Sequence, residues 1–439
     1  MKSRSLLFVL ISILLQNLYS QTLTPSQAYE LSLQNSDKIQ SLDYQLKANK
    51  ESINQAKSRL YPTVMYQTSY QQSNYDINSK VSSVEDERIK QKLKEHSISL
   101  NQPIFDVELS SQVDVEESRY KTISAEVELK KQEHARDVLK AYMDLFESIN
   151  SIHLYESYLE FTNHKMDLIS EKYNMNLATK MDLLESKVEY QNALINLDKE
   201  KELYEVNKKH LKYYIGDIEL EPVALKTSNQ ITLEVEELKK EIASIEDINS
   251  SLKVQQAQNL LKMYKDEVRN SMSLHLPKIN LSAIHTKYDI DNPTADSTYD
   301  KKQQFMISLR MPLFQGGYST SKVAASKLNV KAANKELLDV KKEVAVDYEK
   351  LVTVFNTSAN SIKLYQEAIK SAKLYATSIE EGFDYGLKSI IDVYEANYKV
   401  FELEEKYIKN IYNLMDSYLG LIILTNNFDK LYLVDNILF

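Results

Sequence analysis

The stretch Arg310-Met311-Pro312-Leu313-Phe314-Gln315-Gly316-Gly317 opens the segment that decides the fold. Residues 318–381 follow it without a proline or a glycine. Within them, apolar side chains recur at steps of three and four, which is a heptad seam. A helix over residues 313–381 spans roughly 100 Å at about 1.5 Å per residue. No ordinary globular core needs such a helix, so the seam predicts a helix packed lengthwise against others. Its apolar positions are Val344, Tyr348, Leu351, Phe355, Ile362, Tyr365, Ile369, Ala372, Ala376, Ile379 and Phe383.

The same arrangement occurs twice along the chain, at an offset of about 210 residues. The proline junction at Pro103 matches the one at Pro312, and residues 171–182 match residues 381–392. We therefore predict two structural repeats. The predicted divisions are a first repeat over 21–216, a linker over 217–232, a second repeat over 233–425 and a tail over 426–439.

Each repeat contains a segment in which the apolar period changes from helical to alternating. Val64, Tyr66 and Tyr70 alternate with polar residues after Pro62, and a similar alternation follows Pro277. A polar, charged stretch over residues 74–95 is predicted to connect the two strands of the first repeat. Strands of about 10 residues with one apolar side are typical of tilted membrane strands, although two surface hairpins would give the same pattern. The predicted strand pairs cover 62–103 and 277–312, with junctions to helices at Pro62, Pro103, Pro277, Pro312, Gly316 and Gly317.

The remaining segments have helical spacing. A short helix begins near residue 25, capped by Thr24 or Ser26, and a second helix covers about 38–59. Residues 235–269 are predicted to be the second copy of that helix. Long helical hairpins are predicted over 104–214 and 313–425.

Composition excludes several classes of function. The formal net charge of −9 disfavours nucleic acid as a partner, because nucleic-acid binding needs a basic surface. Cysteine is absent, and the seven histidines show no paired metal-ligand spacing. No nucleophile signature is present. We therefore expect no enzyme activity, no cofactor and no metal. Residues 1–20 have the basic start and short apolar run of a secretory signal peptide.

The predicted strands constrain the assembly. Four strands per chain cannot close a membrane barrel, because the smallest barrels have about eight strands and open edges are not tolerated in lipid. Three chains together would supply twelve. The predicted fold is mainly α-helical with a membrane β-barrel part, built as a trimeric β-barrel and α-barrel tube from a two-fold internal repeat.

The chain resembles the TolC-type outer membrane efflux proteins over nearly all of the mature sequence. The residues that carry the resemblance are those from Leu23 to Leu33, those from Met311 to Gly317, and the paired segments 173–182 and 383–392. The resemblance implies a homotrimer in the outer membrane, in contact with its lipid, with an α-helical tunnel through the periplasm. It also implies docking to an inner-membrane pump through a periplasmic adaptor protein.

The resemblance further implies a gate at the periplasmic ends of the helices. In the family, tyrosine, arginine and carboxylates beside the second tip close the channel. Here Phe383 has no hydroxyl, Lys388 cannot bind bidentately as arginine does, and Met181 replaces a hydroxyl residue. The implied gate residues are Asp182, Phe383, Lys388, Asp392 and Glu395.

The hairpin tips are the implied contacts with the adaptor. Gly386 stands where a left-handed helix cap is needed, and Asn176 is the commonest substitute for glycine there. Leu177 and Leu387 are candidates for apolar contact. The implied tip residues are Asn176, Leu177, Ala178, Thr179, Gly386, Leu387 and Ser389.

The sequence thus predicts a passive exit duct of a tripartite efflux or type I secretion system. The alternative is a periplasmic coiled-coil adaptor or scaffold without a membrane barrel. An adaptor has one helical hairpin and a β region richer in glycine, whereas this chain has two matched hairpins with prolines at four junctions. A surface-exposed structural coiled coil would lack the alternating strands.

Overall fold

A computed structural model describes residues 23–77, 87–217, 228–242, 248–291 and 300–438. The predicted signal peptide lies outside these residues, as does most of the predicted linker. Among the described helices, none combines the length and the apolar character that a membrane crossing requires.

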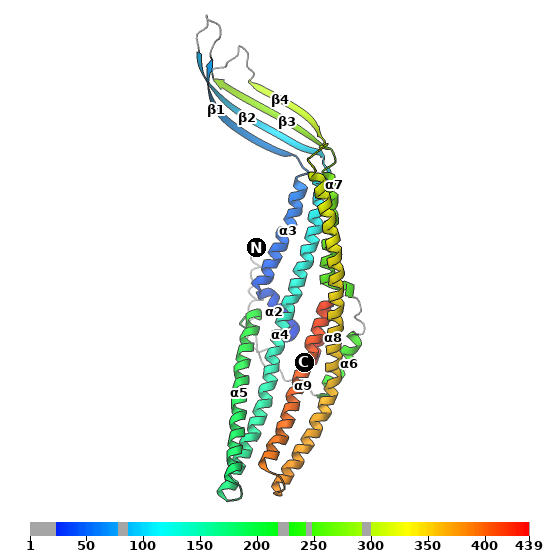
Figure 1. The fold of residues 1–439 in the computed structure, drawn as a ribbon. Helices are drawn as coiled ribbons and strands as arrows, with labels where there is room; N and C mark the ends of the chain where they lie inside the picture. The colour runs from blue at the N-terminus through cyan, green and yellow to red at the C-terminus, as the bar shows by residue number, and fades with distance from the viewer. Residues whose placement is uncertain (1–22, 78–86, 218–227, 243–247, 292–299, 439) are drawn as a thin grey trace, which may run out of the picture. The chain divides into compact units, whose positions relative to one another are not determined.

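Helices make up most of the described chain, and one antiparallel sheet accompanies them (Figure 1). The first repeat contains α2 (Pro25–Asn35), α3 (Asp37–Ser58), β1 (Thr63–Ile77), β2 (Glu87–Phe105), α4 (Val107–Asn174) and α5 (Lys180–Ile215). The second contains most of α6 (Ser228–Ile242), and also η1 (Ile248–Ser250), α7 (Leu252–Ser273), β3 (Lys278–Asp291), β4 (Lys301–Arg310), α8 (Tyr318–Asp384) and α9 (Ile390–Leu424). The predicted tail contains η2 (Phe428–Leu431) and α10 (Tyr432–Leu438).

The chain forms two compact units, and each unit takes segments from both repeats. One unit contains Met1–Leu42, Glu126–Gln255 and Val340–Phe439. The other contains Asp43–Ala125 and Gln256–Asp339, and therefore holds all four strands. The repeats are thus not two independently packed domains, because each unit needs both copies to complete its packing.

The sheet has the order β1-β2-β3-β4, with every neighbouring pair antiparallel. Two strands are much longer than the predicted 10 residues: β1 has 15 and β2 has 19. The prediction that residues 74–95 form a polar connection was therefore wrong at both ends, since 74–77 and 87–95 lie in strands. Pairing across the backbone, which polar side chains do not prevent, carries the strands beyond the alternating apolar segment.

One junction also differs from the prediction. Pro62 and Pro277 each immediately precede a strand, and Pro312 follows β4. Pro103, however, lies inside β2 and opposite Asn280, next to a register shift between Pro103 and Phe105. A proline is tolerated there because a bulge disrupts the ladder. The turn into α4 comes at Asp106, whose Oδ1 accepts hydrogen bonds from the backbone N–H groups of Glu108 (2.9 Å) and Leu109 (3.2 Å).

The second junction uses glycine instead of a side-chain cap. Gly316 and Gly317 have φ angles of 59° and 85°, which residues with a Cβ rarely adopt. The two glycines therefore let the chain turn sharply from Pro312 into α8. Leu313 and Phe314, which precede them, are 90% and 86% exposed.

The strand register sorts the side chains of the sheet onto two chemically different faces. On one face, Val64 lies opposite Leu100, Leu100 opposite Ala283 and Ala283 opposite Phe305. The other face is mostly polar, and its members include Gln67, Ser97, Ser99, Ser282 and Ser308. We call the first the apolar face; its apolar members are Val64, Tyr66, Tyr70, Ile98, Leu100, Ile279, Leu281, Ala283, Phe305, Ile307 and Leu309.

The prediction that residues 235–269 form one helix was wrong. The segment is divided into the end of α6, the short helix η1 and most of α7. α7 alone, with 22 residues, matches the 22 residues of α3. α6 begins at Ser228, inside the segment predicted as a linker, and its Ile231, Val235 and Leu238 are buried in the main core.

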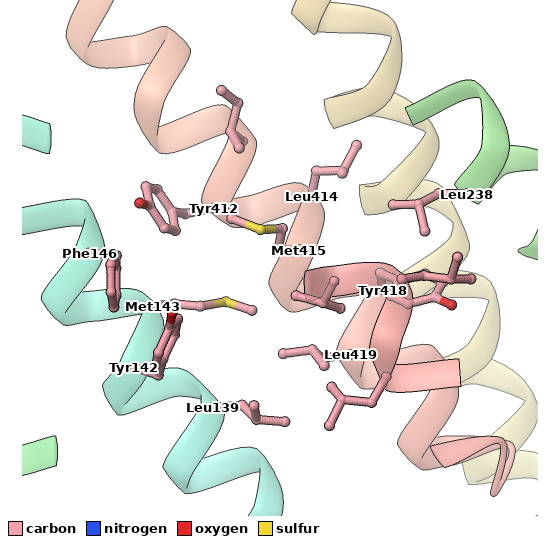
Figure 2. Packing of buried hydrophobic residues seen from close by; sticks show 14 of the residues in the cluster. Leu139, Tyr142, Met143, Phe146, Leu238, Tyr412, Leu414, Met415, Tyr418 and Leu419 are labelled. Atoms are coloured by element: carbon pink, nitrogen blue, oxygen red, sulfur yellow. The ribbon is translucent and has the colours of Figure 1, made fainter. Parts of the chain in front are cut away.

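The main core lies in the first unit, between α4 and α9 and beside α6 (Figure 2). It includes Leu139, Tyr142 and Phe146 from α4, and Met415 and Tyr418 from α9. The heptad prediction holds in this part of the chain, because every one of the eleven seam positions is buried or half-buried. The C-terminal segment joins the same core through Leu431, Leu433 and Val434.

The N-terminal helix α2 is fixed to this core by hydrogen bonds. Thr24, rather than Ser26, caps α2: its hydroxyl accepts from the N–H of Gln27 at 3.2 Å, and the Gln27 side chain accepts in return from the N–H of Thr24. The backbone N–H of Ser26 donates instead to Asp435 at 3.1 Å. The buried Tyr142 hydroxyl donates to the carbonyl of Leu23.

A substitution of Phe355 tests whether the apolar seam of α8 stabilises the first unit. Its side chain is fully buried beside Tyr418, with ring centroids 6.4 Å apart. Phe355→Ala should lower stability by about 3–5 kcal/mol, because it leaves a cavity in the core. Thermal unfolding in detergent, followed by circular dichroism, measures the change. The neighbouring Val354 is 41% exposed, so Val354→Ala should shift the melting temperature far less; equal shifts would contradict a core role for Phe355.

Candidate functional site

The first hairpin tip joins α4 to α5 through a left-handed turn. Asn176 has a φ angle of 58°. The N–H of Leu177 donates to the carbonyl of Lys172 at 2.7 Å, and the N–H of Asn176 donates to that of Tyr173 at 3.0 Å. This pair of bonds is the Schellman arrangement, which satisfies the last carbonyls of a helix.

The second tip, between α8 and α9, repeats this geometry. Gly386 has a φ angle of 72°. The N–H of Leu387 donates to the carbonyl of Gly382 at 2.8 Å, and the N–H of Gly386 donates to that of Phe383 at 2.9 Å. The left-handed positions predicted at Asn176 and Gly386 are both present. The two copies thus use different residues for one backbone turn.

Each tip is completed by a capping box at the start of the returning helix. The Asp182 carboxylate accepts from the N–H of Thr179 at 2.8 Å, and the Asp392 carboxylate accepts from the N–H of Ser389 at 2.8 Å. The hydroxyls of Thr179 and Ser389 accept in return from the N–H groups of Asp182 and Asp392, both at 3.1 Å. Hydrogen bonds from Ser389 hold the pKa of Asp392 below its usual range, with a smaller contribution from the charge of Lys388. Asp182 and Asp392, two of the three predicted gate carboxylates, are therefore bound to the tip of their own hairpin.

A small hydrophobic cluster joins the two hairpins next to the tips. Ile169 of α4 packs with residues of α8 and α9, and Ala178 of the first tip lies against the same cluster. Ala178 was predicted to contact an adaptor, but its side chain is half-buried inside the chain. The buried members of the tip cluster are Ile169, Ala376, Ile379, Ile390, Val393, Tyr394 and Ala396.

Two polar contacts join the hairpins beside the tip cluster. The ammonium group of Lys172 lies over the ring of Phe383, 4.4 Å from its centroid. Lys165 forms an ion pair with Glu380 at 3.1 Å. Phe383 lacks the hydroxyl expected for the family, and its ring is instead in cation–π geometry with a cation that sequence reasoning missed. The contact joins residues 211 positions apart, so no local pattern could have indicated it.

Lys388 lines a groove between the two hairpin tips. The groove is lined by residues of both hairpins, among them Lys172, Asp182 and Lys388. Within the part of the chain that the structure describes, no ion pair links Lys388 to a carboxylate. Its side-chain stem lies over Gly382, where a Cβ would be 2.9 Å from the Cγ of Lys388. Gly382 thus allows the lysine stem to cross the helix.

Glu395, the remaining predicted gate residue, lines a different groove. This second groove lies between α5 and α9, beside Glu185, Glu189 and Tyr394. Burial raises the pKa of Glu189, and the charge of Glu185 raises it further. The predicted gate residues therefore do not all lie together. Asp182, Phe383 and Lys388 line the groove between the tips. Glu395 lines the second groove together with Glu185 and Glu189.

The outermost side chains of both tips are apolar and exposed. Leu177 is 72% exposed, Leu387 is 78% exposed and Tyr385 is 82% exposed. Met175 and Met181 are 65% and 71% exposed. Among the described residues, no group of three potential ligands could hold a metal ion. The tips therefore offer apolar contact surface held on two rigid turns.

Known proteins resemble this chain both in sequence and in fold. The sequence profile described as outer membrane efflux protein matches residues 28–217 and 246–427. Outer membrane protein TolC of Escherichia coli strain K12 is 22% identical over 387 residues, which is 84% of this chain and 76% of that protein.

Two solved structures show the same fold. The outer membrane protein VceC of Vibrio cholerae has a TM-score of 0.77 and 14% identity, covering 91% of this chain and 95% of that chain. The outer membrane channel CmeC of Campylobacter jejuni has a TM-score of 0.74 and 14% identity, covering 91% and 85%.

Glu189 makes the second groove sensitive to pH. Because its pKa is raised in the folded protein, the free energy of unfolding falls as the pH rises through that pKa. Glu189→Gln removes the half-buried charge, so it should raise the melting temperature at about pH 8 and have little effect at about pH 5. Melting curves at both pH values measure this.

A matched control is Glu205→Gln, which neutralises an exposed carboxylate on the same helix and outside the apolar stripe of that helix. It should change the two melting temperatures nearly equally. If Glu189→Gln also changed the melting temperatures at the two pH values equally, the half-buried charge of Glu189 would not be the source of the pH dependence.

Proposed function

The chain belongs to the outer membrane efflux protein family and is an outer membrane exit duct, and we propose that three copies form one channel that is gated at the hairpin tips. In this proposal the duct is passive, and the energy for export comes from an inner-membrane pump coupled through a periplasmic adaptor. The proposal rests on one observation: within the described chain, the sheet has an open edge at β1, another at β4, and an exposed apolar face.

The sheet has one apolar face and two outer strands that each pair with a single neighbour. β1 and β4 stand at the ends of the strand order. The apolar face is well exposed in the single chain, with Val64, Ile307 and Phe305 at 68%, 67% and 70%. In lipid an apolar face is favourable but an open edge is not. Three sheets joined edge to edge would close a barrel of twelve strands, with the apolar face toward lipid and the polar face toward the lumen.

The helix α5 supports association of chains in the other unit. Leu184, Val188, Ile195, Val206 and Tyr213 recur at helical spacing and are each 51–79% exposed. Exposed apolar residues that recur at helical spacing along a 36-residue helix are typical of a packing surface. We assign this stripe to the contact with the neighbouring chain.

For the gate, we propose that the two hairpins move as one body at their tips. The tip cluster, the contact of Lys172 with Phe383 and the ion pair of Lys165 with Glu380 join them within one chain. Lys388 and Glu395, both exposed, are then available to neighbouring chains. Exposed ion pairs contribute about 1 kcal/mol or less, which suits a gate that must open.

We also propose that the exposed tips bind the adaptor. Leu177, Leu387 and Tyr385 supply an apolar surface at the end of each hairpin. The Schellman turns and the capping boxes of Thr179 and Ser389 hold that surface in place, so little conformational entropy is lost on binding.

Assembly through α5 can be tested with Ile195. Ile195→Asp places a charge in the middle of the stripe and should convert the detergent-purified trimer to monomers, as measured by light scattering coupled to size exclusion. The control Ile195→Leu keeps the apolar surface and should remain trimeric. If the wild-type protein is a monomer and does not fractionate with the outer membrane, the proposed duct is wrong.

The gate can be tested by removing charge without breaking a helix cap. Asp392→Asn keeps an acceptor for the N–H of Ser389, and Glu395→Gln keeps the shape of the side chain. Together they should raise the single-channel conductance of the resting state in planar bilayers, with a shift in the closed-to-open equilibrium of up to about fivefold per lost ion pair. The control Glu205→Gln, an exposed position of α5 outside the apolar stripe, should not change it. Unchanged conductance in the double variant would remove Asp392 and Glu395 from the gate.

A further inference from the structure

Two lysines lie directly opposite each other where the apolar face of the sheet ends. Lys287 of β3 and Lys301 of β4 are register partners and therefore project from the same face. That face is the one that carries Ala283 and Phe305, because each lysine is four residues from one of them along its strand. Like charges at directly opposed positions destabilise a sheet unless something compensates them.

Among the described residues, no carboxylate forms an ion pair with either lysine, and Asp289, two residues along β3 on the same face, lies opposite Lys94. Lys92, on the same face, has Asp291 at 3.8 Å. Among the described residues, Lys287 and Lys301 form neither an ion pair nor a side-chain hydrogen bond. The row of register partners that contains the two lysines continues across the sheet to His96 and then to Thr68. The Nδ1 of His96 is 3.1 Å from the hydroxyl of Thr68. The row therefore offers two cations and no carboxylate.

A shallow hollow lies beside this lysine pair, on the side toward the apolar residues. It is lined by Ile98, Leu100, Ala283 and Phe305, with His285 and Gln303 between these residues and the lysines. These side chains share the apolar face with the lysine pair. The surface therefore has a cationic end next to an apolar hollow within one face of one sheet.

We propose that Lys287 and Lys301 bind the phosphate group of an anionic membrane lipid, whose acyl chain lies along the hollow. A lipid fits both parts of the surface: its phosphate compensates two opposed ammonium groups, and its chain covers exposed apolar side chains. Inorganic phosphate would satisfy only the cations. The inference rests on the proposed membrane location of the apolar face, but it adds a specific site and a preferred class of lipid.

The test compares lipids at the surface of the full-length protein in phosphatidylcholine vesicles. Electron paramagnetic resonance with spin-labelled phosphatidylglycerol or spin-labelled phosphatidylcholine measures how strongly each associates with the protein. The wild type should select phosphatidylglycerol. Lys287→Gln together with Lys301→Gln should lower that selectivity, by up to about tenfold for the site.

The matched control removes two positive charges from the opposite face of the same sheet. Lys302 and Arg310 of β4 project from the polar face, so Lys302→Gln together with Arg310→Gln should leave the selectivity unchanged. Equal selectivity in the wild type and the Lys287→Gln, Lys301→Gln variant would overturn the inference. Full displacement of the spin-labelled lipid by an equal concentration of inorganic phosphate would overturn the lipid as occupant.

The experiment also separates this inference from the proposed function. A wild-type protein that does not enter the vesicles overturns both, because no lipid then reaches the face. A wild-type protein that enters the vesicles without distinguishing the two lipids overturns only the lysine site.

Discussion

The structure depends on a sheet that one chain leaves incomplete. β1 and β4 each have one neighbour within the described chain, and the apolar face of the sheet is exposed. Backbone groups at an open edge are costly in lipid, whereas apolar side chains facing lipid are favourable. These two facts together favour closure with other copies over burial against the chain's own helices. The exposed apolar side chains of α5 likewise favour packing against another copy, in the unit that contains this helix.

The hairpin tips show how a duplicated sequence keeps one geometry with different residues. A glycine at position 386 and an asparagine at position 176 both reach the left-handed region. A serine cap with Asp392 matches a threonine cap with Asp182. Because the carboxylates are used in these caps, each tip is a rigid turn whose outer surface is apolar. Rigidity and exposed apolar area together suit a surface that binds a partner.

The residues that the resemblance implies for a gate differ here from the family pattern, and the structure shows which contacts they make within one chain. Phe383 has no hydroxyl to donate, but its ring lies under the ammonium group of Lys172. That contact joins α4 to α8 and adds to the tip cluster that holds the two hairpins together. Lys388, which stands where the family has arginine, lies across Gly382 and keeps its charge exposed.

Local patterns in the sequence determined the elements that depend on near neighbours. The seam on α8 and the left-handed positions at Asn176 and Gly386 follow from spacing and residue type, and the family could be expected from the resemblance of its motifs. The tertiary structure decided the features that depend on distant segments: the extension of β1 and β2 through polar residues, the bulge at Pro103, the division of residues 235–269 and the pairing of Lys287 with Lys301. Strand pairing and long-range contacts set these, because a backbone ladder accepts polar side chains and a register is fixed only when two strands meet.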